Sequence, residues 1–187
     1  MQKENLDTAG KKFLVDIMLI KLGRWLRILG YDCKIPKDNE ISDEDLLDIA
    51  EKENRTLITM DKSLSERKTK IGIIHIPSEF NSVKAQLEFL IKKKYIANPM
   101  TEGNIEEKVE SSVRCSKCGS ILFEITKEEL NDSYKKKIEK NKREDIDRAL
   151  SSYNLFWICK DCHQIYWKGS HWKKIIEFLS KLEVKDY

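Results

Sequence analysis

The sequence predicts an α/β protein, with a parallel sheet flanked by helices and a small metal-binding domain after it. Residues 12–97 alternate between strand-like and helix-like stretches, an order typical of a parallel sheet with helices on both faces. A segment rich in Pro, Gly and Asn at 98–104 then interrupts the periodicity. Two Cys-x-x-Cys pairs follow, and pairs at this spacing are typical of a closed metal site.

The elements of the first domain follow from short apolar runs and from the residues that begin and end helices. Strands are expected at 12–16, 32–36, 56–61 and 71–77. Helices are expected at 17–30, 42–54, 63–68 and 81–97. Gly30 is suited to end the first helix. Ser42 opens the second with Asp45 three residues on, a capping-box pattern, and Asn81 is expected to cap the last.

Composition shifts divide the chain into five segments. The first Cys pair, "RCSKCGS", and the second, in "WICKDCHQIYWKGSHW", belong to one small domain with a charged, helix-prone insert between them. The expected boundaries are 1–11 for an N-terminal extension, 12–97 for the α/β domain, 98–112 for a linker, 113–172 for a zinc ribbon with its insert at about 127–150, and 173–187 for a C-terminal helix or tail.

Composition also indicates the size of the core, the kinds of partner that the charge permits and the expected cellular compartment. With 187 residues, 40% of them hydrophobic, the chain can bury a real core. The net charge of +3 permits nucleic-acid binding without requiring it. The amino terminus lacks the apolar core of a signal peptide and no apolar run could cross a bilayer, so a cytoplasmic protein without a membrane partner is expected. Cys33, outside the two pairs, is expected to be a small buried side chain.

Two aspartates follow strands of the predicted sheet. Asp16 ends the first strand, Asp61 ends the third, and Asp43 begins the helix between them. Ligands of parallel α/β sheets collect at the carboxyl ends of the strands, so Asp16 and Asp61 share a crevice if their strands are neighbours. Clustered carboxylates favour Mg²⁺ or Mn²⁺, which can activate water and offset charge on a phosphate.

Each of these residues also has a purely structural interpretation. Asp16 can cap the first helix, Asp43 can favour the positive end of its helix, and Asp61 can begin a turn. Thr59 can be an ordinary β-former, or it can hydrogen-bond a carboxylate or the attacking water. The joint placement of Asp16 and Asp61 at equivalent strand ends favours a site.

Basic and aromatic residues are candidates for binding nucleic acid. Lys21, Arg24 and Arg27 recur every three residues on the first helix, where they either contact phosphates or form a solvated face. In the ribbon, Trp157 is expected inside and Trp167 or Trp172 partly outside, where it could stack on bases. The candidate nucleic-acid-binding residues are Lys21, Arg24, Arg27, Lys62, Trp167, Lys168 and Trp172.

The cysteine pairs are the strongest local signal. Cys115, Cys118, Cys159 and Cys162 supply four thiolates, so the site is full and therefore structural. Zn²⁺ fits best, and an iron site of rubredoxin type is the alternative. Gly119 relieves crowding at the first turn.

Several stretches of the chain together resemble a known family. They are Val15-Asp16 before "LGRWLRILGYD", followed by "SDEDLLDIA", "RTLITMDKSL" and "YWKGSHW". The pattern is similar to PIN-like ribonucleases, most closely the group named for the RNase domain at the C-terminal end of the Mut-seven exonuclease, whose members carry a zinc ribbon. The resemblance implies a PIN-like three-layer fold and a metal-dependent endoribonuclease, with Asp16, Asp43 and Asp61 at the family's acidic positions. Many PIN domains have a fourth acid after the next strand, where this chain offers His75 and, further on, Glu79.

The resemblance also implies partners. RNA is the expected substrate, with ribosomal RNA or the ribosome and a second copy of the chain as further candidate partners. Structural Zn²⁺ and catalytic Mg²⁺ or Mn²⁺ are the expected cofactors. The alternatives are a non-catalytic RNA- or ribosome-binding factor that keeps the fold, and an enzyme acting on small phosphoesters through the same crevice.

Overall fold

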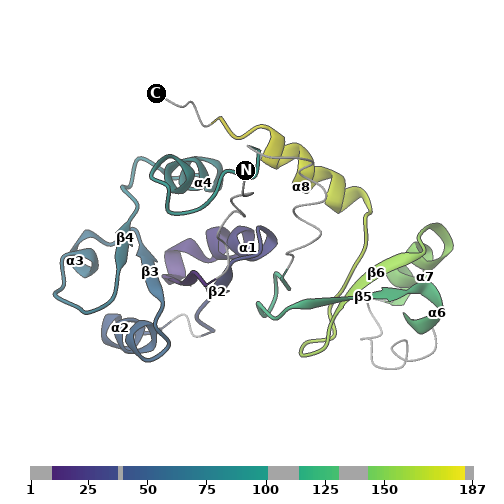
Figure 1. Cartoon of the computed structure of the whole chain (residues 1–187), viewed down its shortest axis with the longest axis horizontal. Coiled ribbons are helices and arrows are strands. Elements are labelled where there is room, and N and C mark those ends of the chain that lie inside the picture. The colour runs from purple at the N-terminus through teal and green to yellow at the C-terminus, as the bar shows by residue number, and fades with distance from the viewer. Residues whose placement is uncertain (1–9, 38–39, 101–113, 131–142, 184–187) are drawn as a thin grey trace, which may run out of the picture. The chain divides into compact units, whose positions relative to one another are not determined.

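The predicted α/β class is confirmed by a computed structural model of the chain (Figure 1). The structure describes residues 10–37, 40–100, 114–130 and 143–183. The chain forms two compact units, Met1–Gly119 with Leu182–Tyr187, and Ser120–Lys181. Most of the expected linker, residues 101–112, lies outside the described residues, as do residues 131–142 of the expected insert.

The first unit contains a parallel four-stranded sheet. Its strands are β1 (Lys12–Val15), β2 (Asp32–Lys34), β3 (Thr56–Thr59) and β4 (Ile73–His75), in the order β2-β1-β3-β4. β1 pairs in parallel with β3, with Val15 opposite Ile58. Leu14, Val15, Leu57 and Ile58 are fully buried. Such short, continuously apolar strands are what a sheet covered on both faces requires.

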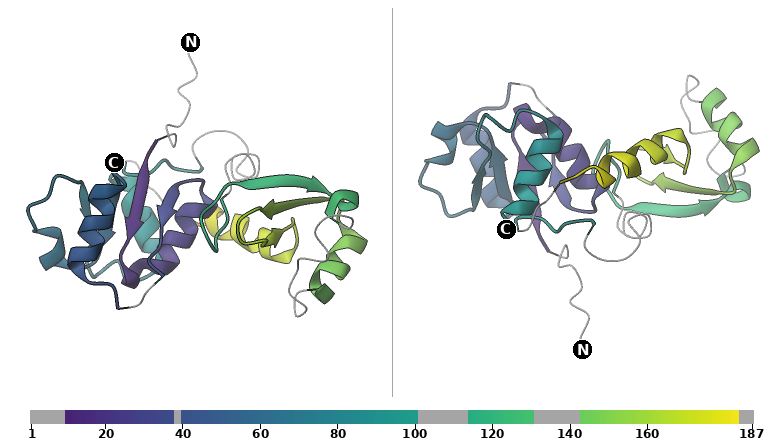
Figure 2. Two further views of the ribbon diagram at one scale, coloured as in Figure 1. Left: turned by 90° about the horizontal axis from the view of Figure 1, so that it is seen from below. Right: turned by 90° about the horizontal axis from the view of Figure 1, so that it is seen from above.

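Helices cover both faces of this sheet. They are η1 (Ile17–Leu19), α1 (Ile20–Ile28), α2 (Asp43–Lys52), α3 (Lys62–Ser65) and α4 (Val83–Lys92). Figure 2 shows α1 and α4 on one side of the sheet and α2 on the other. Leu14 and Leu57 pack against Leu46 of α2 and Leu64 of α3. The sheet with its two helical faces forms the expected three layers.

Gly23 allows α1 to lie very close to the sheet. A Cβ atom at this position would come within 2.8 Å of both Val15 Cγ2 and Ile35 Cγ1. With any larger residue, α1 or the side chains of Val15 and Ile35 would have to shift. Gly23 therefore permits the close approach of α1 to β1, the strand that Asp16 follows.

Two of the three capping residues named from the sequence are confirmed, whereas α3 and α4 end at Ser65 and Lys92, before the expected ends at 68 and 97. Ser42 caps α2 and accepts from the Asp45 amide at 3.1 Å. Gly30 follows α1 with φ of 91°, the left-handed conformation that glycine favours. The prediction that Asn81 caps α4 is wrong, because the side chain of Ser82 is the one that accepts from the Ala85 amide, at 3.2 Å.

The second unit is built on a three-stranded antiparallel sheet. β5 (Leu122–Thr126), β6 (Leu155–Cys159) and β7 (Ile165–Tyr166) lie in that order. Helices α6 (Lys127–Glu129) and α7 (Arg143–Ser152) fall between β5 and β6, and α8 (Ser170–Ser180) follows β7. Within the described residues, none of the helices is long and apolar enough to cross a membrane.

The core of this unit corrects one sequence expectation. Phe156 and Ile158, on one face of β6, are buried and pack with Ile165 and with Leu150 of α7. Trp157 lies between them in the strand, so its side chain projects from the other face and stays half-buried. Phe156 therefore takes the inner place that had been expected for Trp157.

Candidate active site and metal centre

The carboxyl edge of the parallel sheet carries the first candidate site. Asp16 directly follows β1, and its amide donates to the Ile58 carbonyl of β3 at 3.0 Å. Asp61 follows the end of β3 by two residues. Because β1 and β3 are neighbouring parallel strands, the two acids leave the sheet at the same edge.

Thr59 links the two acidic positions. Its side chain is fully buried, and its hydroxyl donates to Asp16 Oδ2 at 2.8 Å. The same oxygen accepts from the Asp61 amide at 2.9 Å. One hydroxyl thus forms hydrogen bonds with both the Asp16 carboxylate and the backbone amide of Asp61. The hydrogen bond from Thr59 to a carboxylate, one of the roles expected from the sequence, is present.

Both acids also have local structural roles. Asp16, 6% exposed, accepts from the Met18 amide at 3.4 Å and caps η1. Asp61 caps α3, and its Oδ1 accepts from the Ser63 hydroxyl at 2.7 Å and the Leu64 amide at 3.1 Å. These donors hold the pKa of the Asp61 carboxyl below its ordinary value. The half-buried Asp61 side chain is therefore ionised at neutral pH, as a metal ligand must be.

Arg67 lies beside the third acid, and sequence reasoning missed it. Its Nη2 is 3.6 Å from Asp43 Oδ2, and its Nη1 donates to Glu44 Oε1 at 2.7 Å. This contact lowers the pKa of the Glu44 carboxyl, and the Arg67 charge contributes to the lowered pKa of Asp61. Arg67 follows the four-residue helix α3, where nothing in the sequence pattern predicted which way it would point.

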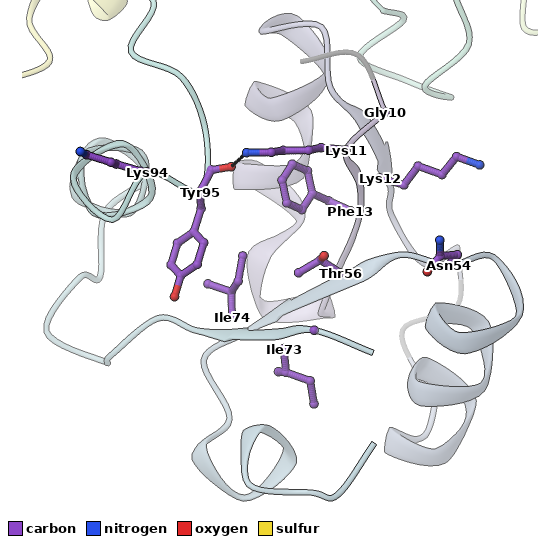
Figure 3. Close-up of a pocket in the computed structure, with 11 residues that line it drawn as sticks. Gly10, Lys11, Lys12, Phe13, Asn54, Thr56, Ile73, Ile74, Lys94 and Tyr95 are labelled. Carbon is purple, nitrogen blue, oxygen red and sulfur yellow. Dashed lines mark hydrogen bonds between the residues drawn. The ribbon is translucent and has the colours of Figure 1, made fainter. Parts of the chain in front are cut away.

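A pocket in the first unit lies at the other edge of the sheet. It is lined at the amino ends of the strands by Lys12, Phe13 and Thr56, together with Tyr95. Figure 3 shows Lys11 directed at the Tyr95 carbonyl, to which it donates at 3.2 Å. Ligands of parallel α/β sheets bind at the carboxyl ends of the strands, so we place the candidate active site at Asp16 and Asp61 and not in this pocket.

The basic row expected on α1 is shorter than the sequence suggested. Lys21 and Arg24 are exposed. Arg27 is only 4% exposed, and its guanidinium donates to three backbone carbonyls, so it is not a phosphate-binding residue on an open face. Lys62, at the start of α3, is exposed and lies 3.8 Å from Glu66.

The ribbon residues expected to bind RNA are all partly buried. Trp167 packs against the core of the second unit, and a Cβ on Gly169 would come within 2.6 Å of its Nε1. Lys168 is partly buried as well. The Trp172 Nε1 is buried and has no hydrogen-bond partner in the described part of the chain.

The four paired cysteines form the second candidate site. The thiol sulfurs of Cys115, Cys118, Cys159 and Cys162 all lie within 4.8 Å of one another, and they could hold a metal ion. Each pair lies on a tight turn: the Gly119 amide donates to the Cys115 carbonyl at 2.7 Å, and the His163 amide to the Cys159 carbonyl at 2.9 Å.

The donor set of this cluster, four sulfurs with no open position, is consistent with a structural zinc site. Among the described residues, Asp16, Asp43 and Asp61 do not come together in a group of this kind. Cys33 is buried as expected, and burial raises the pKa of its thiol to about 12.

Comparison with known proteins identifies a family. The family model described as Mut7-C RNAse domain matches residues 11–179, which include the carboxylate edge and all four paired cysteines. Searches of curated proteins and of solved structures gave no match. An RNase domain implies a ribonuclease-type function with RNA as substrate. The match covers most of the sequence, and the chain therefore belongs to the Mut7-C RNAse domain family.

Proposed function

We propose that this protein is a metal-dependent endoribonuclease whose reaction centre is the carboxyl edge of the parallel sheet. The observation that carries the proposal is the Thr59 hydroxyl, which holds the Asp16 carboxylate and the Asp61 amide at neighbouring strand ends. A buried hydroxyl that orients a nearly buried carboxylate is more than helix capping requires. This arrangement is expected where a carboxylate must be held in one orientation to act as a metal ligand.

The residues at this edge suit a hard divalent cation. Asp16, Asp61 and Asp43 offer carboxylate oxygens, the ligands that Mg²⁺ and Mn²⁺ prefer. Asp61 is held in its ionised form by its hydrogen bonds. A bound ion would supply an activated water and offset charge on the phosphate. Thr59 then acts by fixing Asp16, and we assign it a positioning role.

Binding of RNA is proposed to rely on Lys21 and Arg24 of α1 and on Lys62 of α3. These side chains are exposed and belong to helices that begin close in sequence to Asp16 and Asp61. Phosphate contacts of this kind give affinity without base preference. Contributions from Trp167, Lys168 and Trp172, binding to ribosomal RNA or the ribosome, and pairing of two chains remain predictions.

The four cysteines are proposed to hold one structural Zn²⁺. With four thiolates there is no open position for a substrate, so the ion would stabilise the fold around it. Elemental analysis of freshly purified protein is expected to give one zinc per chain. Iron at the same ratio would indicate the rubredoxin-type alternative, and the absence of both metals would contradict the proposal.

Asp61→Asn tests the enzymatic part of the proposal. Asparagine is as good a helix cap as aspartate, so α3 should keep its start while the negative charge is lost. We expect RNA cleavage with Mg²⁺ or Mn²⁺ to fall by roughly 1,000-fold, because the charge that holds the ion is removed. Binding of the same RNA should persist.

Asp48→Asn is the matched control, since Asp48 is an exposed acid of α2 that, among the residues the structure describes, forms an ion pair with Lys52 of its own helix. Equal cleavage by Asp61→Asn and the parent would show that Asp61 is a turn residue and no metal ligand. RNA binding in EDTA without cleavage by the parent would favour the non-catalytic factor. Turnover of small phosphoesters in place of RNA would favour the third function.

A further inference from the structure

Arg27 has a role that neither RNA binding nor catalysis explains. Its Nε donates to the Cys33 carbonyl at 2.7 Å, which fastens the guanidinium to the strand β2. Its Nη1 donates to the carbonyls of Ser116 at 3.1 Å and Lys117 at 3.0 Å. Ser116 and Lys117 are the two residues between the cysteines of the first Cys-x-x-Cys pair. All of these residues belong to the first compact unit.

Arg114 fastens the same loop from its start. Its amide donates to the Arg27 carbonyl at 3.1 Å. Its side chain bridges two more carbonyls, with Nε donating to Gly30 at 3.1 Å and Nη1 donating to Gly119 at 3.2 Å. The loop is therefore held to the C-terminal end of α1 at its start and in its middle, and its end is tied to its start through the Arg114 side chain.

Gly119 shows how closely the guanidinium approaches. The residue has φ of +91°, and an added Cβ would lie 3.0 Å from Arg27 Nε and 3.3 Å from its Cζ. Glycine thus meets two requirements at once, the left-handed turn after the second cysteine and room for the arginine.

We propose that Arg27 is a positioning residue of the metal site, which orders the Cys115–Cys118 loop on the α/β unit so that both thiols are placed before a metal binds. The inference rests on the metal site of the proposed function. A trans peptide points its N–H opposite to its C=O. With the Ser116 and Lys117 carbonyls turned toward Arg27, the Lys117 and Cys118 amides point away from it. The arginine thus fixes the orientation of two peptides inside the ligand loop.

Two physical effects favour metal binding by such a loop. Ordering the loop in advance removes the conformational entropy that metal binding would otherwise have to offset. Four thiolates around a divalent ion also leave an excess of negative charge, which a buried guanidinium reduces. Burial lowers the pKa of Arg27, but an arginine remains protonated at neutral pH.

Arg27→Lys separates these effects, because lysine keeps the positive charge and loses the planar fork that reaches three carbonyls at once. Metal affinity of the full chain is measured by competition with a chelator, using Zn²⁺ and Co²⁺ as the probes. We expect affinity to fall by roughly 10- to 100-fold, as for other residues that support metal ligands. The Co²⁺–thiolate absorption should change shape, because the ligand loop is less fixed.

Arg55→Lys is the matched control. Arg55 belongs to the same unit, its side chain is 12% exposed, and it donates to the carbonyls of Phe13 and Asp32. This change should lower the stability of the sheet and leave metal affinity unchanged.

Parent-like affinity and an unchanged Co²⁺ spectrum in folded Arg27→Lys would overturn the inference. So would equal losses of affinity in both variants, which would indicate general destabilisation. Arg27→Met is the second variant, and if both Arg27 variants stay unfolded with zinc present, Arg27 is a folding residue and the inference fails. A parent protein that binds neither metal would refute the metal site itself.

Discussion

Replacing Thr59 by valine tests whether the buried hydroxyl organises the carboxylate edge. Valine is β-branched like threonine and has nearly the same shape, so packing around β3 is largely kept while both hydrogen bonds of the hydroxyl are lost. The Asp16 carboxylate loses a donor and the Asp61 amide loses its acceptor. A bond to a charged group contributes about 1.5–3 kcal/mol, and an unpaired buried amide costs about 1–3 kcal/mol.

The expected net loss of unfolding free energy is about 3 kcal/mol, because the added methyl group regains part of the cost by apolar burial. For a unit of this size the loss corresponds to a fall in melting temperature of roughly 10–20 °C. Thermal and denaturant unfolding measure it. Thr56→Val, at the other end of the same strand, is the matched control and should change stability much less.

A double-mutant cycle with Asp16→Ala isolates the bond between the two side chains. If Thr59 orients Asp16, the coupling energy should be about 1.5–3 kcal/mol. Thr59→Ser, which keeps a hydroxyl, should recover part of both stability and RNA cleavage. A coupling below about 0.5 kcal/mol would refute the reasoning, since independent sites differ from additivity by no more than that.

Three other changes test separate features. Replacing Lys21 and Arg24 together by alanine should weaken RNA binding across sequences and flatten its dependence on salt, as measured by titration; an unchanged slope would mark a solvated face. Gly169→Ala should cost about 1–3 kcal/mol in denaturant unfolding, because the new methyl overlaps an indole ring, and wild-type stability would contradict that close contact. The pKa of Glu53 is lowered by hydrogen bonds from a lysine and an arginine. The ionised Glu53 therefore stabilises the fold fully above its unfolded pKa of about 4.3, and this stabilisation is lost as pH falls through the lower folded pKa. Glu53→Gln should make the free energy of unfolding less dependent on pH in this acid range. A free energy of unfolding with the same pH profile as the parent would contradict the prediction.

The features that the sequence predicted best are those set by periodicity along the chain. Alternating apolar runs predicted a parallel sheet, and the topology of such sheets brought Asp16 and Asp61 to one edge. The Cys-x-x-Cys spacing likewise predicted the sulfur cluster. Each prediction needed only local pattern and a general rule of architecture.

The features that the sequence could not predict depend on how residues are rotated around a helix axis and on partners that are far away along the chain. Three residues turn an α-helix by about 300°, so Arg27 is rotated by about 120° from Lys21 and leaves the solvent face. Its partners at 116 and 117 are about 90 positions away in the chain. Arg67 was missed for a similar reason, because its contacts with Asp43 and Glu44 join the turn after α3 to the start of α2.

The position of β1 in the sheet has a consequence for the nascent chain. β1 is made first and lies between β2 and β3, so one of its edges stays unpaired until residues 56–59 have been synthesised. At typical rates of elongation the roughly 40 intervening residues take about 2–8 s. During that interval the unpaired backbone edge of β1, which carries the apolar residues Leu14 and Val15, can pair with strands of other chains. Substitutions that slow the docking of β3 should therefore reduce the yield of soluble protein more than they reduce the melting temperature of the molecules that do fold.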